Sequence, residues 1–441
     1  MKFGIFYEHQ LPRPWDDGQE LKLFQDALDQ VELADKLGID YAWEVEHHFL
    51  EEYSHSSCPE VFLAAASQRT KNIRLGHGIK LMPPGYNSPA RIAEEIATLD
   101  LVSNGRVEFG TGESASRAEL EGFNINPMER RAMWRETTEQ VCNMLAMDPY
   151  PGFQGKYFSM PTRNVVPKPV QKPHPPLWVA CSNRDTIHLA AQLGIGALTF
   201  AFVDPAEAKK WVDDYYETFK NECVPIGHAV NPNIAMVTSF STHEDAAEAY
   251  RRGFDGFKFF QFGLGHHYAF GTHKPGRTNV WKQYEAVKAA MGDEALDFLG
   301  GGGDGIGTPD QLRTHLRKFV DAGVDQTVFI QQGGKNQHEH ICDSLNLFAD
   351  KVMPEFKAEE EARQKRKMDE LAPYIEKAMQ RKQWMKEMTD DEIPAYPAYG
   401  AMVAQIDPST LDDTARARAE RWVKMRQVLK EMEDKEKAAS R

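Results

Sequence analysis

The sequence has few cysteines, no excess of positive charge and no long apolar run, and each absence excludes a class of protein. Its five cysteines are an odd number without paired spacing, so a disulfide framework is not expected and a reducing compartment fits best. A net charge of −14, with no basic stripe among aromatics, excludes nucleic acid as an expected partner. The absence of a leader peptide and of a membrane-length apolar segment predicts a cytoplasmic protein without membrane contact.

The sequence does have a long alternation of short apolar runs and helical patterns, which continues to about residue 350. Such alternation is typical of a parallel sheet with crossover helices. Eight strands are predicted, at residues 3–7, 41–45, 73–82, 107–111, 177–181, 197–201, 234–240 and 327–331. Eight βα units close naturally into a barrel, whereas an open doubly wound sheet usually shows an early glycine fingerprint. We therefore predict an α/β fold, a TIM (β/α)8 barrel.

Three segments depart from this alternation. A proline-rich stretch at 150–176 and an aromatic, glycine-rich stretch at 256–305 fall after strands, where barrels usually insert lids and pocket walls. From about residue 354 the composition shifts to charged residues and methionine in helical patterns, and the last helix carries one apolar stripe. The predicted domains are a barrel at 1–353 and a helical C-terminal arm at 354–441, which packs on its own barrel or joins a homo-oligomer.

A carboxylate and two imidazoles stand where the second predicted strand meets its loop. Glu46, His47, His48 and Phe49 directly follow the apolar run at 41–45, and barrels keep their chemistry at the carboxyl ends of strands. Histidine titrates near neutral pH, so this pair indicates proton handling or ligand orientation. Two histidines that are merely satisfied by hydrogen bonds at a strand end would look the same in sequence, and the tetrapeptide leaves both interpretations open.

Five groups of residues, in order over roughly the first 200 positions, carry a resemblance to a known family. They are Lys2–Phe6 (KFGIF), Glu46–Phe49 (EHHF), Asn72–Gly78 with Leu81–Pro83 (NIRLGHG and LMP), Leu99–Arg106 with Phe109–Gly110 (LDLVSNGR and FG), and Val166–Trp178 (VPKPVQKPHPPLW). With them the chain resembles the bacterial-luciferase-like, flavin-dependent monooxygenases. The arm after residue 354 lies outside the resemblance.

The resemblance implies a two-component enzyme. A β/α barrel of this family binds reduced FMN, usually supplied by a separate flavin reductase, and lets it react with O2. The resulting flavin C4a-hydroperoxide oxygenates a small, largely apolar organic substrate, while the protein supplies position, dryness and polarity.

The resemblance also implies roles for residues near the second and third strands. His47 is expected beside the flavin ring as the catalytic proton carrier, and Glu46 is expected to orient His47 or the flavin. The family often has a non-proline cis peptide at the end of its third strand, which corresponds to Gly78-Ile79 here. The alternative is that Gly78 only allows a close backbone approach in an ordinary strand.

Two loops are expected to contact the cofactor. After the fourth strand, Gly110 and Thr111 let backbone amides and hydroxyls approach a flat ring or a phosphate. Bacterial luciferase has a reactive cysteine and an arginine in this loop, whereas this chain has Gly112 and Glu113, which argues against the luminescent aldehyde reaction.

The second loop is assigned to the FMN phosphate, because amides at a helix N-terminus bind phosphate well. Ser182, Asn183 and Arg184 add hydroxyl, amide and guanidinium donors, and Cys181 is expected as a small buried residue near the flavin. A simple helix cap by Ser182 or Asn183 is the alternative.

Two further stretches are interpreted as covers of the pocket. The aromatic residues between Phe254 and Phe270 could exclude water from an apolar substrate, although half of them could be ordinary core. The glycine-rich run at 300–307 is interpreted as a lid hinge, and Thr308-Pro309 as the cap of the next helix.

Three other functions are compatible with parts of this pattern. A metal-dependent hydrolase could use His9, Glu44, Glu46, His47 and His48, but adjacent histidines point to opposite strand faces, so no metal site is expected. A flavin-storing scaffold without catalysis is the second rival. A deazaflavin (F420)-dependent dehydrogenase on the same barrel is the closest alternative, since related barrels use that cofactor to move hydride.

Overall fold

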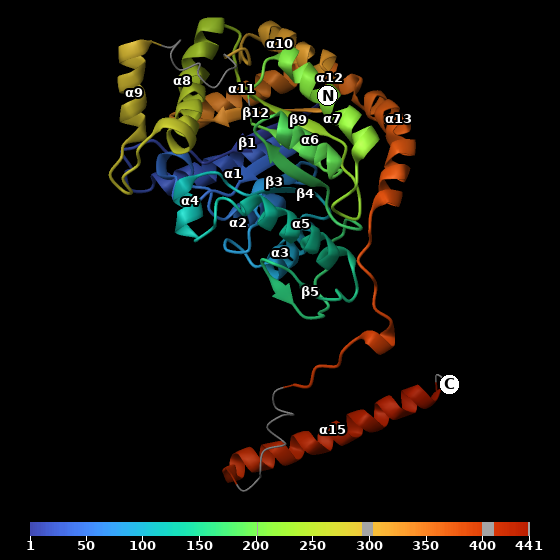
Figure 1. The fold of residues 1–441 in the computed structure, drawn as a ribbon. Helices are drawn as coiled ribbons and strands as arrows, with labels where there is room; N and C mark the ends of the chain where they lie inside the picture. The colour runs from blue at the N-terminus through green and yellow to red at the C-terminus, as the bar shows by residue number, and fades with distance from the viewer. Residues whose placement is uncertain (201, 293–302, 399–409, 440–441) are drawn as a thin grey trace. The chain divides into compact units, whose positions relative to one another are not determined.

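The computed structural model describes residues 1–200, 202–292, 303–398 and 410–439 (Figure 1). The chain divides into two compact units, Met1–Glu387 and Met388–Arg441. None of the described helices is long and apolar enough to cross a membrane.

The first unit is built on a closed barrel of eight parallel strands, in the order β1-β12-β9-β8-β7-β4-β3-β2. The strands are β1 (Lys2–Tyr7), β2 (Tyr41–Val45), β3 (Arg74–Leu81), β4 (Val107–Gly112), β7 (Leu177–Cys181), β8 (Gly196–Thr199), β9 (Ile234–Ser239) and β12 (Gln326–Gln332). Each predicted strand overlaps one of them, and the ring closes where β1 pairs with β12. The predicted TIM barrel is therefore confirmed.

Helices surround the barrel, and local sequence explains where several of them begin. The surrounding helices are α1 (Gln19–Leu37), α2 (Pro59–Arg69), α3 (Pro89–Val102), α4 (Arg117–Gly122), α5 (Arg130–Ala146), α6 (Arg184–Gln192), α7 (Pro205–Glu222), α10 (Pro309–Asp321) and α11 (His338–Lys351). The Asp204 side chain accepts hydrogen bonds from the first amides of α7, and Thr308 forms a capping box with Gln311 at α10. Proline follows each cap, where no amide hydrogen is needed.

Two insertions overlap the stretches predicted at 150–176 and 256–305, and the second begins earlier than predicted. The first contains the small hairpin β5 (Phe153–Gln154) and β6 (Ser159–Met160). The second contains β10 (Ser241–Thr242), α8 (Ala246–Gly265), the π-helix η2 (His266–Phe270), α9 (Val280–Met291) and β11 (Ile306–Gly307). The predicted aromatic cover is thus largely a helix, whose Phe257 and Phe260 are buried in the barrel interior. Residues 300–302 of the predicted hinge lie outside the described residues.

The barrel interior is filled at its lower levels by two tryptophans. The rings of Trp43 and Trp178 meet edge to face with centroids 5.3 Å apart. Each ring packs against a glycine of the neighbouring strand. A Cβ at Gly76 would lie 2.2 Å from Trp43, and one at Gly196 would lie 2.4 Å from Trp178, so a larger residue does not fit at either position. The floor of the barrel is therefore a packed core.

The residues after 353 belong partly to the barrel unit. Helices α12 (Met353–Ala358) and α13 (Glu360–Arg381) lie within the first unit, and Leu371 and Ala378 of α13 are buried in its outer core. Helix α15 (Asp413–Ala439) lies in the second unit, and its apolar stripe, including Trp422 and Leu429, is exposed. The compact unit therefore continues past the predicted boundary at 353/354, through Glu387.

Candidate active site

A cavity opens at the carboxyl ends of the barrel strands and is called the site cavity below. Its empty volume is about 1100 Å³ when the open mouth is counted. The ends of β1, β2, β3, β4, β7 and β8 line it, together with α5, α8, η2 and the short 3-10 helix η1 (Glu51–Tyr53). This is the face on which β/α barrels carry their chemistry.

Six of the ten predicted site residues line this cavity. They are His47, Gly78, Ile79, Cys181, Ser182 and Asn183. The other four, Glu46, Gly110, Thr111 and Arg184, are not part of its lining.

His47 is the central polar group of the site cavity. Its Nδ1 lies 3.0 Å from Glu119 Oε1, and its Nε2 lies 3.7 Å from Glu8 Oε2. Burial alone would lower the pKa of His47, but the charges of Glu119 and Glu8 raise it to about 9. The imidazole is therefore protonated at neutral pH and holds its Nε2 proton toward Glu8.

The two carboxylates that flank His47 differ in their own proton affinity. Burial raises the pKa of Glu8 to about 7, against the lowering effects of His47 and of the Tyr53 hydroxyl, which donates to Oε1 over 3.0 Å. Glu119 is buried too, but its pKa is lowered because it faces His47 and accepts hydrogen bonds from Ser114 Oγ and the amide of His48. Glu119 thus stays ionised and holds the ring, whereas Glu8 can exchange a proton near neutral pH.

Glu46 supports the loop and does not face the cavity. Its carboxylate accepts hydrogen bonds from the Leu81 amide at 2.7 Å and from Asn87 Nδ2 at 3.0 Å, and Lys80 Nζ lies 3.6 Å away. Burial would raise the pKa of Glu46, but a hydrogen bond from His48 and the charge of Lys80 lower it. The carboxylate therefore ties β2 to the end of β3.

The cis peptide that the resemblance implied at Gly78-Ile79 is not found. All cis bonds among the described residues precede prolines, and the Gly78-Ile79 bond is not one of them. Instead β3 bulges here, since its register with β2 jumps from Glu44–His77 to Val45–Ile79. Glycine allows a close approach at this point, because a Cβ at Gly78 would lie only 3.0 Å from the Phe6 ring, although the strand is bulged and not ordinary. Gly78 and Ile79 both line the site cavity.

Gly110 and Thr111 lie within the barrel wall. A Cβ at Gly110 would stand 1.9 Å from the carbonyl oxygen of His77, so glycine is required for the contact between β3 and β4. Thr111 Oγ1 donates to the Trp178 carbonyl at 2.9 Å and accepts from Trp134 Nε1 at 3.0 Å. Both residues thus hold the wall, and neither offers a free group to a ligand.

Two of the three donors predicted in the loop after β7 line the site cavity, and the third does not. Ser182 and Asn183 are exposed at the cavity, and the Asn183 side chain also caps α6 in a capping box with Thr186. Arg184 turns outward, where its guanidinium pairs with Asp214 on α7. Burial raises the pKa of the Cys181 thiol to about 12, so this side chain forms an uncharged part of the cavity wall.

Several residues of the site were not predicted from the sequence. Glu8 could have been found, because it directly follows the first predicted strand. Arg130 and Arg131 on α5 line the cavity, and Arg131 pairs with Glu113 at 2.7 Å. Glu119 carried no signal, since it contacts His47 only through the fold. Tyr268, another wall residue, was grouped with the aromatic cover.

The five side chains that could have held the metal of a hydrolase do not lie around one point. His9 Nε2 pairs with Glu44 at 2.9 Å in the buried core, while His48 lies between Glu46 and the ring of Phe123. His47 faces Glu8 and Glu119 instead of either group. These five residues therefore make separate pairs.

Comparison with protein families identifies the class of this fold and site. The family model described as luciferase-like monooxygenase matches residues 1–326, and the chain belongs to this family. The predicted resemblance is thus confirmed, and relatives named as monooxygenases support an oxidoreductase.

Three similar proteins show the variety around this chain. It is 28% identical, over 44% of its length and 52% of the relative's, to the oxygenase component of a flavin-dependent trigonelline monooxygenase from Acinetobacter baylyi. It is also 28% identical, over 39% of its length and 52% of the relative's, to an F420-dependent glucose-6-phosphate dehydrogenase from Amycolatopsis mediterranei. A solved monooxygenase from Streptomyces bottropensis has a TM-score of 0.65 and 26% identity, covering 81% of this chain and 100% of that one. The chain spans 52% to 60% of the length of the first curated relatives it matches.

Proposed function

We propose that this protein is the oxygenase of a two-component monooxygenase, which uses reduced FMN and O2 to oxygenate a small, largely apolar organic substrate. A separate flavin reductase would supply the reduced flavin, as the name of the trigonelline relative's oxygenase component suggests. The observation that carries the proposal is a largely buried His47, 14% exposed and with its pKa raised to about 9, at the mouth of a barrel of this family. A cytoplasmic location and a homo-oligomeric state stay predictions.

The residues of the site cavity fit a flavin mononucleotide. Apolar side chains of Val45, Ile79 and Leu81 and the bulged backbone of β3 offer a flat wall for a ring system. Ser182, Asn183 and the two arginines of α5 offer hydroxyl, amide and guanidinium donors for a phosphate. In this proposal Arg130 and Arg131 take the role that the sequence suggested for Arg184.

When bound, the reduced flavin would supply the electrons that reduce oxygen, and the chain's own residues would control protons and water. His47 would hold a proton at Nε2 and stabilise negative charge that develops beside it. Glu119 would keep the ring oriented through Nδ1, and Glu8 would pass protons to and from Nε2. Phe200, Phe260 and Tyr268 would exclude water from the mouth.

A deazaflavin-dependent dehydrogenase is the second candidate, because one relative is named as F420-dependent. In that reaction a neutral His47 would take the hydroxyl proton of an alcohol as its hydride leaves for the deazaflavin, and the protonated ring would return the proton when a carbonyl is reduced. Binding measurements with FMN and with F420 under the same conditions separate the two, since the monooxygenase proposal requires the tighter binding to be that of FMN.

The decisive experiment reconstitutes the protein with FMN, a flavin reductase and NADH, and follows oxygen uptake and product over a panel of small aldehydes, ketones and alkanes. We expect His47→Ala to bind FMN but to lose product formation per oxygen consumed. His188→Ala is the matched control, because His188 is half-exposed on α6, away from the cavity. Equal coupling in wild type and His47→Ala would contradict the proposal.

A further inference from the structure

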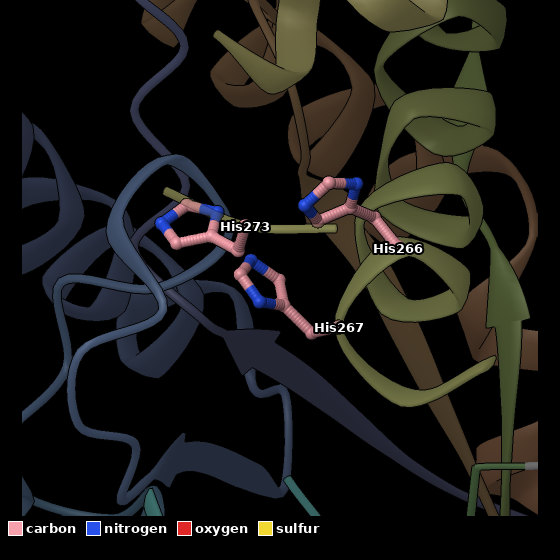
Figure 2. A group of neighbouring side chains, drawn as sticks. All are labelled: His266, His267 and His273. Atoms are coloured by element: carbon pink, nitrogen blue, oxygen red, sulfur yellow. The ribbon is translucent and has the colours of Figure 1, made fainter. Parts of the chain in front are cut away.

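Three histidines gather beside the site cavity, outside the machinery described so far. They are His266 and His267 of η2 and His273 of the loop that follows, called the histidine cluster below. One ring nitrogen from each lies within 4.8 Å of the other two. Figure 2 shows the three rings arranged around a common point, each with a nitrogen directed toward it.

The nitrogens of this cluster lack the partners that buried imidazoles normally have. His266 is 3% exposed, and neither of its ring nitrogens has a hydrogen-bond partner. His267 Nε2 and His273 Nδ1 are buried without partners as well. Unpaired buried nitrogens cost free energy, so three of them facing one point indicate a missing ligand.

The far sides of two rings are held from behind, as is usual for histidines that bind metal. His267 has a hydrogen bond to the backbone of Leu50. His273 Nε2 lies 3.2 Å from Glu51 Oε1, within ion-pair distance but without the geometry of a hydrogen bond, and Arg13 balances Glu51 through Oε2 at 2.6 Å. The Gly276 amide also donates to Glu51 Oε1 at 2.7 Å. The carboxylate is therefore positioned to orient the His273 ring.

We propose that His266, His267 and His273 bind one divalent transition-metal ion of the zinc class, with water in the fourth position. Imidazole nitrogen suits Zn²⁺, Ni²⁺ and Cu²⁺ and is a poor ligand for Mg²⁺ or Ca²⁺. Zinc–nitrogen bonds of about 2.0–2.1 Å place tetrahedral ligands roughly 3.4 Å apart, so small ring rotations close the 4.8 Å arrangement.

The backbone next to the histidine cluster leaves room for its rings. A Cβ at Gly271 would lie 2.3 Å from His266 Nδ1, so glycine leaves room for this ring.

The position of the cluster gives the metal a structural role. The helix that holds His266 and His267 also carries Tyr268, which lines the site cavity, and Tyr53 beside Glu51 lines it too. A bound ion would fasten η2 to the loop that follows it, and this loop lies against η1 through His273 and Glu51, so the ion would help to fix one wall of the cavity.

The test uses the full chain, freed of metal by a chelator and then titrated with Zn²⁺ alone against a chromogenic competitor. We expect one Zn²⁺ per chain, a Zn²⁺-dependent rise in Tm, and at least a 100-fold loss of affinity in both His267→Ala and His273→Ala. Glu51→Gln is expected to weaken binding by about 10- to 100-fold. Cys58→Ser is the control, because Cys58 is an exposed thiol away from the cluster and its removal is expected to change nothing.

Circular dichroism of each metal-free variant separates misfolding from ligand loss, and His273 is suited to this because it lies on a loop. Should His267→Ala fail to fold, His273→Ala alone decides. Absence of stoichiometric Zn²⁺ in the wild type, or unchanged affinity in a folded His273→Ala, would overturn the proposal.

Discussion

The two ends of the barrel hold buried histidines in opposite charge states. At the carboxyl end, His47 faces Glu8 and Glu119, and its pKa is raised to about 9. At the amino end, His174 precedes β7, and burial lowers its pKa to about 4. His174 is satisfied as a neutral ring, because Nδ1 donates to the Pro175 carbonyl and Nε2 accepts from the His228 amide.

The difference teaches that burial alone does not decide the protonation of an imidazole, because nearby carboxylates can outweigh it. Burial lowers the pKa of both rings, but two carboxylates reverse the effect at the mouth. A charged group kept in a cavity is typical of a working site, and a neutral satisfied ring at the opposite end is typical of a stabilising one.

The largest effect is expected from removing the charge that holds His47. Glu119→Gln keeps the shape of the side chain but not its charge, so the pKa of His47 falls and the ring loses its orientation. We expect product formation to fall by at least about 100-fold, as is usual for loss of a positioned acid. Glu121→Gln on the same helix is the control, because Glu121 pairs only with exposed Arg117. Similar losses in both variants would mean that α4 itself is disturbed.

At the amino end of the barrel, removal of the His174 ring should affect stability alone. His174→Ala leaves the Pro175 carbonyl and the His228 amide without partners, which costs about 1–3 kcal/mol of unfolding free energy. Turnover of the folded variant is expected to match the wild type, measured with chemical denaturation beside the coupled assay. A fall in turnover without loss of stability would contradict the claim that His174 serves only the stability of the barrel.

The two rings should also act on stability in opposite directions of pH. The raised pKa of His47 contributes stability that is present below its ordinary value of 6.5 and is lost as pH rises toward 9. The lowered pKa of His174 contributes stability that is present above 6.5 and is lost as pH falls toward 4. Denaturation midpoints across this window should show the alkaline loss flattened in His47→Asn and the acid loss flattened in His174→Ala. The reverse assignment would refute the charge states.

The smallest effect on turnover is expected from removing the Tyr53 hydroxyl, which donates a hydrogen bond to Glu8. Tyr53→Phe removes a hydrogen bond that lowers the pKa of Glu8, so this pKa should rise above about 7. The pH profile of turnover should move upward, with a change in maximal rate below about tenfold, since one neutral hydrogen bond contributes about 0.5–1.5 kcal/mol. Tyr157→Phe is the control, because Tyr157 lies in the first insertion.

Much of the barrel could be predicted from the sequence because its signals are local. A buried parallel strand is a short apolar run, and a cap beside a proline marks a helix start, so β2, β7 and the start of α10 were found nearly to the residue. The motif at Glu46–Phe49 placed His47 at the cavity for the same reason, since a residue just after a barrel strand lies at the active face.

What only the tertiary structure decided is which side chains meet. Glu8, His47 and Glu119 come from three separate segments, and their electrostatic coupling exists only when the ring of strands closes. Arg184 has the right local sequence for a phosphate, yet Asp214 of the next helix draws it outward. The aromatic stretch became a helix because burial of Phe257 and Phe260 against the barrel outweighs the low helix propensity of its glycines. Local propensity thus determined the elements, and contacts between distant residues determined the chemistry.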